Sequence, residues 1–102
     1  MNTLIVLFNL KPDADSSAYE VWAKTTDLPV VRGLSSVDSF EVYRSQGLFG
    51  GGDAPYEYVE VIEIADTEKF GAEVGTDTMA KVASEFQGFA DNPVFMLTRK
   101  FS

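Results

Sequence analysis

The stretch TLIVLFNL at residues 3–10 decides the fold class of this chain. Its side chains are large and mostly apolar at both alternating positions, a pattern typical of a strand that is covered on two faces. Lys11-Pro12-Asp13 ends the strand, because proline has no backbone N–H to continue a ladder. The N-terminal segment therefore predicts a central strand of a sheet.

A first helix follows this strand. Ser17 and Glu20 have the spacing of a capping box, and apolar residues follow at helical spacing. We expect this helix to end before Pro29, since a residue that precedes proline is disfavoured in the helical conformation. Gly33 and the serines that follow it then predict a turn.

A second helical region occupies the later part of the chain. Asp66 is placed to cap it, and Gly75-Thr76 is expected to interrupt it. An apolar stripe then predicts that the helix continues to about Phe89, with Asn92-Pro93 as its end. Three further strands are predicted from alternating apolar residues, at Val37–Arg44, Tyr56–Ile64 and Val94–Phe101.

The order β-α-β-β-α-β predicts a ferredoxin-like α+β fold, with a four-stranded antiparallel sheet and helices on one face. Residues 1–102 form a single domain, because the length allows one hydrophobic core. The first and third strands should be central in this topology. Residues 46–55 contain four glycines and predict a flexible loop, which we interpret as a lid over a cavity.

Both faces of the predicted sheet are apolar. Ile5 and Leu7 point to one side of the first strand, whereas Val6 and Phe8 point to the other, and the last strand repeats the pattern. Two helices can cover only one face. Leaving the second face in water would sacrifice several kcal/mol, at roughly 25 cal/mol per Å² of apolar surface. We therefore expect a homodimer in which two sheets pack together as a dimeric α/β barrel.

Charge and composition exclude several classes of function. The net charge is −8 at pH 7 and the basic residues are scattered, which argues against nucleic acid or an anionic membrane as a partner. The chain has no cysteine and no histidine, so thiolate nucleophiles, Ser-His-Asp triads, zinc fingers and histidine-ligated haem are excluded. We expect no cofactor and no metal. No apolar run is long enough to span a membrane, and a cytoplasmic location is the expectation.

Several short motifs resemble the REDY-like (HapK) family of the dimeric α/β-barrel superfamily. They are NLKP at 9–12, YEVWA at 19–23, TDLP at 26–29, RGL at 32–34, SVDSF at 36–40 and VYR at 42–44. Members of this family occur in the biosynthesis of prodiginine red pigments, at the bipyrrole branch. The resemblance implies a small aromatic or pyrrolic ligand. Cofactor-free monooxygenases of the same superfamily use Asn, Trp, Tyr and Arg near their cavities, and Asn9, Trp22, Tyr43 and Arg44 are of these types.

Glu60 is the main catalytic candidate. It shares a strand face with Tyr58 and Ile62, and an apolar environment raises the pKa of a carboxyl group. Such a group is suited to act as a general acid or base. A structural ion pair with Arg44 or Arg99 is the alternative.

Asp27 is the second catalytic candidate, as a carboxylate base at the mouth of a cavity. The alternative is a turn residue, because an aspartate at a helix end before Pro29 is common there. Arg32 could hold an anionic or phenolic substrate, or pair with Asp27; a surface ion pair is the alternative.

Four further residues are candidates for substrate binding. Asn9 would place an amide on an apolar strand face, to meet a ligand or to cap the strand. Trp22 would form a cavity wall or part of the core. Tyr43 and Tyr58 lie in neighbouring predicted strands and would contact either the ligand or a second copy of the chain.

Two classes of function follow. The protein is either a small cofactor-independent enzyme of secondary metabolism that acts on an aromatic or pyrrolic compound, or a non-catalytic protein that binds and carries such a compound. A cofactor-free monooxygenase acting on a polyketide-like aromatic is one form of the enzyme.

Overall fold

The computed structural model describes all residues 1–102, and it contains one four-stranded antiparallel sheet. The strands are β1 (Asn2–Leu10), β2 (Val37–Arg44), β3 (Tyr58–Ile64) and β4 (Ala90–Thr98). Their order in the sheet is β2-β3-β1-β4, so the first and third strands are central, as predicted. β3 begins at Tyr58 rather than at Tyr56.

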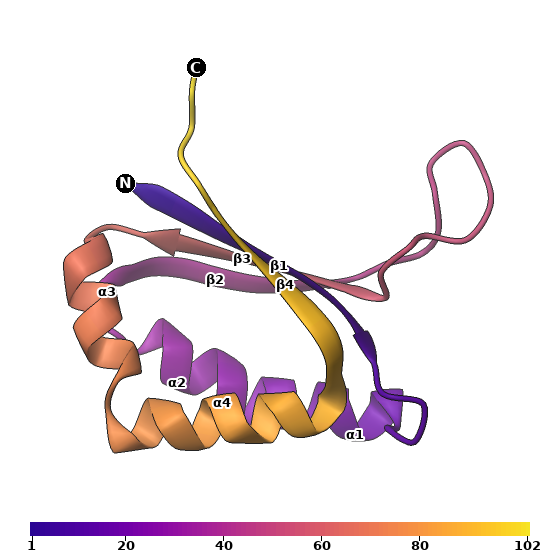
Figure 1. Cartoon of the computed structure of the whole chain (residues 1–102), viewed down its shortest axis with the longest axis horizontal. Coiled ribbons are helices and arrows are strands. Elements are labelled where there is room, and N and C mark those ends of the chain that lie inside the picture. The colour runs from indigo at the N-terminus through magenta and orange to yellow at the C-terminus, as the bar shows by residue number, and fades with distance from the viewer.

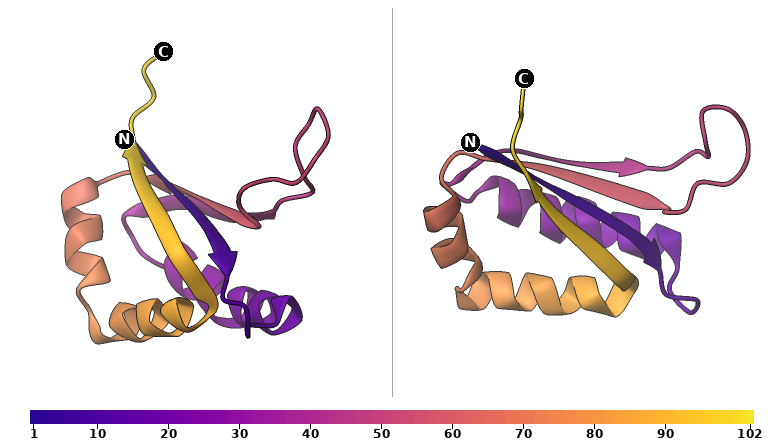
Figure 2. Two further views of the ribbon diagram at one scale, coloured as in Figure 1. Left: turned by 45° about the vertical axis from the view of Figure 1, so that its right-hand side comes forward. Right: turned by 45° about the horizontal axis from the view of Figure 1, so that its top comes forward.

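The helices all lie on one side of this sheet (Figure 1). They are α1 (Ser16–Trp22), the π-helix η1 (Ala23–Asp27), α2 (Leu28–Arg32), α3 (Thr67–Val74) and α4 (Asp77–Phe89). The segment from α1 to α2 and helix α4 run beneath the sheet, while α3 stands at one end and joins the two layers (Figures 1 and 2). The predicted ferredoxin-like α+β fold is confirmed.

The start of the first helix differs from the prediction. The N-cap is Asp15, whose carboxylate accepts a hydrogen bond from the Ala18 N–H at 3.2 Å. The predicted capping box of Ser17 and Glu20 is therefore wrong. Asp15 precedes both residues, adopts an extended backbone and satisfies an N–H group that has no partner within the helix.

The first helical region also continues past Pro29, to Arg32, contrary to the prediction. The π-helix η1 explains the difference, because the Leu28 N–H donates to the Ala23 carbonyl five residues earlier. Pro29 then occupies the first turn of α2, where a missing N–H is tolerated. The helical conformation thus continues through Pro29.

The last strand begins at Ala90, directly after α4, and ends at Thr98. The predicted helix end at about Phe89 is confirmed, whereas the predicted bounds of the strand, Val94 and Phe101, are wrong. β4 pairs only with β1, and its register shifts between the pairings of Leu7 and Asn9, where Asn92 takes a positive φ of 46°. Proline is tolerated at such an irregularity in an edge strand.

The core beneath the sheet is rich in aromatic side chains. Phe8 of β1 is fully buried and stacks on Tyr58, with ring centroids 5.4 Å apart. Tyr19 of α1 and Phe86 of α4 meet the same ring edge-on, at 5.5 Å and 4.9 Å. These aromatic contacts pack α1 and α4 against the centre of the sheet.

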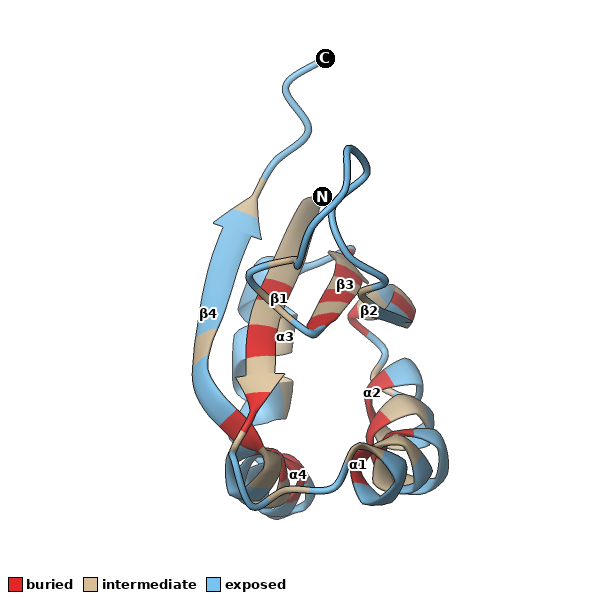
Figure 3. Ribbon diagram, turned by 90° about the vertical axis from the view of Figure 1, so that its right-hand side faces the viewer, coloured by how far each residue is buried: buried red, intermediate tan, exposed pale blue.

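The other face of the sheet carries an apolar row that no element covers. Paired positions place Tyr43, Val59, Leu7 and Val94 side by side across the four strands. Met96 of the next row is 41% exposed. Figure 3 shows most of β4 exposed. The prediction that both faces of the sheet are apolar is confirmed.

Candidate functional site

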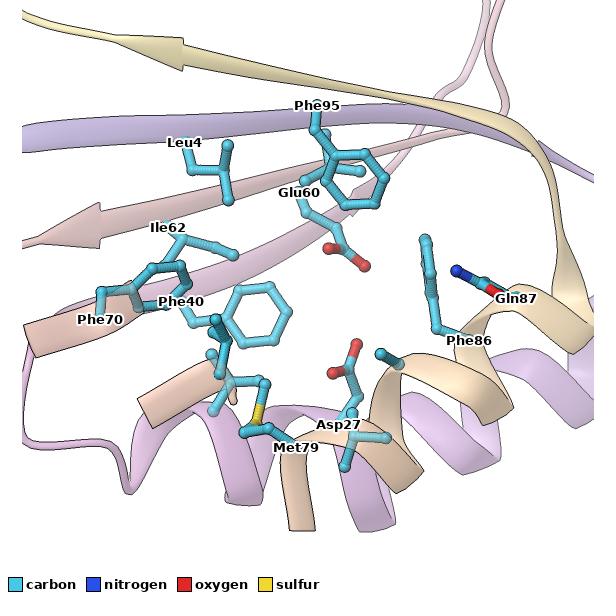
Figure 4. Close-up of a pocket in the computed structure, with 15 residues that line it drawn as sticks. Leu4, Asp27, Phe40, Glu60, Ile62, Phe70, Met79, Phe86, Gln87 and Phe95 are labelled. Atoms are coloured by element: carbon cyan, nitrogen blue, oxygen red, sulfur yellow. The ribbon is translucent and has the colours of Figure 1, made fainter. Parts of the chain in front are cut away.

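A cavity of about 270 Å³ lies between the sheet and the helices (Figure 4). All four strands and the elements η1, α2, α3 and α4 contribute to its lining, and 12 of its 15 lining residues are hydrophobic. Val74, Gln87 and Phe95 are lining residues that are also exposed, so they mark where the cavity opens. The cavity is therefore an apolar chamber that opens to the surface between β4 and the helices α3 and α4.

Glu60 projects into this chamber from β3. The strand alternates strictly, so Glu60 shares the helix-facing side with Tyr58 and Ile62, and only 5% of Glu60 is exposed. The Tyr19 hydroxyl donates a hydrogen bond to Glu60 Oε2 at 3.4 Å. The strand face predicted from the sequence is the observed one.

Asp27 enters the chamber from the opposite wall, as the last residue of η1. It is 5% exposed, and no hydrogen bond contributes to the shift of its pKa, whose cause is burial. Figure 4 shows the carboxyl groups of Asp27 and Glu60 pointing toward one another across the cavity. The structure thus brings the two predicted catalytic candidates together.

Burial changes the acidity of both carboxyl groups. Desolvation raises the pKa of Asp27 from 3.8 to about 7. Desolvation, and then the charge of Asp27, raises the pKa of Glu60 from 4.5 to about 8, although the hydrogen bond from Tyr19 acts in the opposite direction. The pair therefore retains a proton at neutral pH and presents one carboxylic acid and one carboxylate.

No basic side chain lines the cavity. Arg44, the predicted alternative partner of Glu60, instead forms an ion pair with Glu20 at 3.3 Å. Arg99 forms no ion pair with Glu60 either, since the chain's other ion pair joins Arg32 to Glu41. The alternative in which Glu60 is half of a structural ion pair is wrong.

Trp22 and Tyr58 lie next to the chamber but do not line it. The Trp22 indole N–H donates to Glu85 Oε1 at 3.0 Å, and its ring packs near Phe89 with centroids 5.6 Å apart. The Tyr58 hydroxyl donates to Glu20 Oε2 at 2.6 Å. Both side chains pack in the aromatic core beside the cavity, and their role in binding a substrate stays a prediction.

The other predicted binding residues lie farther from the cavity. The Arg32 guanidinium donates to the Phe40 carbonyl at 2.9 Å and to the Glu41 carboxylate at 3.1 Å. Tyr43 is 56% exposed and belongs to the open face of the sheet. The structure does not bring these residues together with Asp27 and Glu60.

Asn9 anchors the loop between β2 and β3. Its amide nitrogen donates to the Pro55 carbonyl and its amide oxygen accepts from the Glu57 N–H, each at 3.0 Å. The loop itself projects beyond the end of the sheet (Figures 1 and 2), and none of its residues lines the chamber. The role of residues 46–55 as a lid stays a prediction.

Sequence reasoning missed Gln87 and Phe95 as residues of the cavity mouth. Gln87 follows Phe86 on α4, and no pattern distinguishes it from a solvated glutamine. Phe95 lies within the predicted strand Val94–Phe101, and its ring contacts Phe86, with centroids 6.3 Å apart. It pairs opposite Val6, in the regular part of the ladder, which places it on the helix-facing side.

Two other features of the structure bear on function. No group of three or more acidic side chains is arranged to hold a metal ion. None of the helices combines the length and the apolar character needed to cross a bilayer.

Solved structures with the same architecture include several small ferredoxin-like proteins. HapK from Hahella chejuensis is 32% identical, with a TM-score of 0.78, and the match covers 100% of this chain and 95% of that one. An antibiotic biosynthesis monooxygenase is 14% identical, with a TM-score of 0.73 and complete coverage of both chains. A dimeric ferredoxin-like protein from Bacteroides fragilis is 12% identical, with a TM-score of 0.68, over 97% of this chain and 95% of that one.

No curated protein matches the sequence. The family described as REDY-like protein HapK matches residues 2–101, almost the whole chain, in agreement with the resemblance found in the sequence motifs. The chain belongs to the REDY-like HapK family.

Proposed function

We propose that the protein is a cofactor-independent enzyme of secondary metabolism that moves protons on a small aromatic or pyrrolic compound held in the cavity. The observation that carries this proposal is the pair of opposed carboxyl groups, Asp27 and Glu60, in a chamber that is otherwise almost wholly apolar. Paired acids with raised pKa values are typical of acid–base catalysis near neutral pH. The family's occurrence in prodiginine pathways supports a pyrrolic substrate.

The two carboxyl groups would divide the chemistry between them. Asp27, as the carboxylate, accepts a proton from an N–H or an acidic C–H of the bound ring. Glu60, as the carboxylic acid, donates its proton to another atom of the same ring, so the ligand is isomerised with no net change in its proton count. The Tyr19 hydroxyl, which donates to Glu60 Oε2, holds that carboxyl group in its orientation.

A second candidate is a non-catalytic carrier for the same class of compound. It is supported by the apolar lining of the cavity, which would shield much of a reactive ring from water. A cofactor-free monooxygenase would use the same chamber and would consume oxygen.

Incubation with 2,2′-bipyrrole derivatives and aromatic polyketide-like compounds, with and without oxygen, followed by mass spectrometry and a binding titration, separates these functions. We expect turnover that does not depend on oxygen and that falls at least tenfold, or about 1.4 kcal/mol in barrier height, in Glu60→Gln. Glu63→Gln is the matched control, because Glu63 lies on the same strand but on the opposite face. Saturable binding without any product would favour the carrier, and oxygen-dependent product would favour the monooxygenase.

We also propose that the protein works as a homodimer joined through the open face of the sheet. The apolar row of Tyr43, Val59, Leu7 and Val94 supports this, since an uncovered row of this kind is an interaction surface. The dimeric protein from Bacteroides fragilis has a similar fold, which is compatible with a second copy as the occupant.

Sedimentation equilibrium tests the dimer. We expect a mass about twice 11.2 kDa for the wild type, and a monomer for Val61→Lys, because Val61 lies on the open face beside Ile5. Val21→Lys, which changes a helix residue that is 62% exposed, should leave the dimer intact. A wild-type monomer at micromolar concentration would contradict the proposed assembly.

A further inference from the structure

We infer that the cavity selects ligands whose planar ring carries a cationic N–H group, such as an amidinium or a protonated imine, and that it rejects anions. This inference rests on the proposed function, because it names the class of ligand for the same pair of carboxyl groups. It is carried by the arrangement of hydrogen-bond acceptors in the chamber and by the charges around it.

The cavity holds more hydrogen-bond acceptors than donors. Asp27 offers both of its oxygens without any partner in the chain, and Glu60 receives only one hydrogen bond, from Tyr19. The two carboxyl groups point toward one another from opposite walls (Figure 4). A ligand lying between them therefore meets acceptors on two sides, and it satisfies them best with N–H donors on two of its edges.

The groups that surround the two acids are neutral or are paired elsewhere. From α1, Tyr19 faces Glu60 with a neutral phenol whose pKa is raised by burial and by the charge of Glu60. From β2, the Arg44 guanidinium is directed to Glu20, and the remaining polar residue of the cavity lining, Gln87 of α4, is neutral. No positive charge offsets the two acids, so an anionic ligand would be repelled and a cationic one attracted.

The rest of the cavity lining suits an aromatic ring. Phe40, Phe86 and Phe95 form parts of the wall, and the volume of about 270 Å³ accommodates a ligand of one or two rings. Aromatic side chains in the wall can also stabilise a cation through their π faces. The chamber thus combines an apolar site for a ring with an acidic site for its charged group.

Proton release follows from this arrangement. Near neutral pH the pair holds at least one proton, because the pKa of Glu60 is about 8 and that of Asp27 is about 7. A cationic ligand favours the ionised form of Asp27, the more acidic of the two groups, and so displaces protons from the pair into the solvent, while Glu60 keeps its proton at neutral pH. Its affinity should therefore increase as the pH rises toward 8, whereas the affinity for a neutral ligand should not.

Three probes of the same shape test the inference: benzamidine, benzamide and benzoate, titrated calorimetrically in two buffers that differ in ionisation enthalpy. At neutral pH we expect benzamidine to bind at least tenfold more tightly than benzamide, with release of protons, and benzoate to show no binding. The double variant Asp27→Asn/Glu60→Gln should lose at least tenfold of the benzamidine affinity and all proton release, while its affinity for benzamide stays within about twofold. Glu63→Gln should bind all three probes like the wild type.

Equal or tighter binding of benzamide or benzoate, or benzamidine binding without proton release, would overturn the inference, as would failure of all three probes to bind. Failure of the proposed function is distinguishable, because it requires that neutral 2,2′-bipyrrole derivatives and polyketide-like aromatics also give neither binding nor product. Binding of those neutral compounds together with a failed benzamidine series would leave the proposed function in place and remove only the preference for cations.

Discussion

The wild-type protein is expected to lose stability as the pH rises from about 4 to about 8, in contrast to the usual behaviour of acidic groups in folded proteins. The pKa values of Asp27 and Glu60 are raised in the folded chain, to about 7 and about 8, from 3.8 and 4.5. The folded state therefore binds more protons than the unfolded state between these values. Stability is highest while both groups are protonated and falls as the pH rises through the folded pKa values.

The effect should be large. Each pKa is raised by roughly three units and one unit corresponds to about 1.4 kcal/mol, so the loss for the pair is on the order of 9 kcal/mol, comparable with the whole stability of many small domains. For a chain of this length it corresponds to a fall in Tm of roughly 20 °C or more. The chain has no histidine and no cysteine, whose ordinary pKa values lie in this pH range, so the measurement reports mainly on this pair.

Thermal unfolding of the wild type and of Asp27→Asn/Glu60→Gln at several pH values is the measurement. The variant cannot ionise at these positions, so its Tm should be nearly constant over the range and should exceed that of the wild type at the alkaline end. A wild-type Tm that is as flat as that of the variant would show that the two carboxyl groups titrate normally. The depth of their burial in solution would then differ from that in the structure.

Replacement of Phe8 with alanine is the second change with a large expected effect. Phe8 is fully buried and contacts the rings of Tyr19, Tyr58 and Phe86. Deleting a buried phenylalanine side chain costs about 3–5 kcal/mol, because the transfer free energy is lost and a cavity remains. Chemical denaturation should show a correspondingly lower free energy of unfolding.

The neighbouring change Leu7→Ala is the control for Phe8→Ala. Leu7 points to the open face, where the single chain leaves it only partly buried, so its truncation should cost the folded chain much less. If the proposed dimer forms, Leu7→Ala should act mainly on the dimer dissociation constant. Equal losses of unfolding free energy in the two variants would contradict the assignment of the aromatic cluster to the core.

The sheet was largely predictable from the sequence, because alternation along a strand has only two possible phases. Once Tyr58 and Ile62 are placed toward the core, Glu60 between them must point the same way, and the structure shows it buried. The apolar character of both faces of β1 likewise predicted a central strand with a second face left to cover.

The helical side of the site was harder to predict, because its geometry depends on π-helical hydrogen bonds of the backbone that the residue pattern does not indicate. The proline rule predicted an end before Pro29, whereas a π-helical turn carries the chain through to Arg32. The place of Asp27 near that proline makes it a candidate base, but its orientation toward Glu60 depends on the π-helical turn and does not follow from the sequence.

The predicted binding residues show a different limit. Trp22, Tyr58 and Arg32 have side chains suited to a ligand, yet each already has a partner within the chain: Glu85, Glu20 and Glu41, respectively. The acidic excess of the sequence gives many such partners to its few donors. Residue type alone does not distinguish a side chain that is available to a ligand from one that already makes its hydrogen bonds within the chain.

The π-helix η1 also affects how this site changes through insertions and deletions. A π-helical turn holds an additional residue compared with an α-helical turn, so its formation is equivalent to inserting one residue into a regular helix. Removing one residue from the segment between Trp22 and Asp27 would restore α-helical bonding and turn the aspartate by roughly 100° about the helix axis relative to what precedes it. The side chain that faces Glu60 thus depends on the length of this segment as well as on the amino acid at position 27, and a variant that retains the aspartate but lacks one residue of the segment should present a different side chain to the cavity.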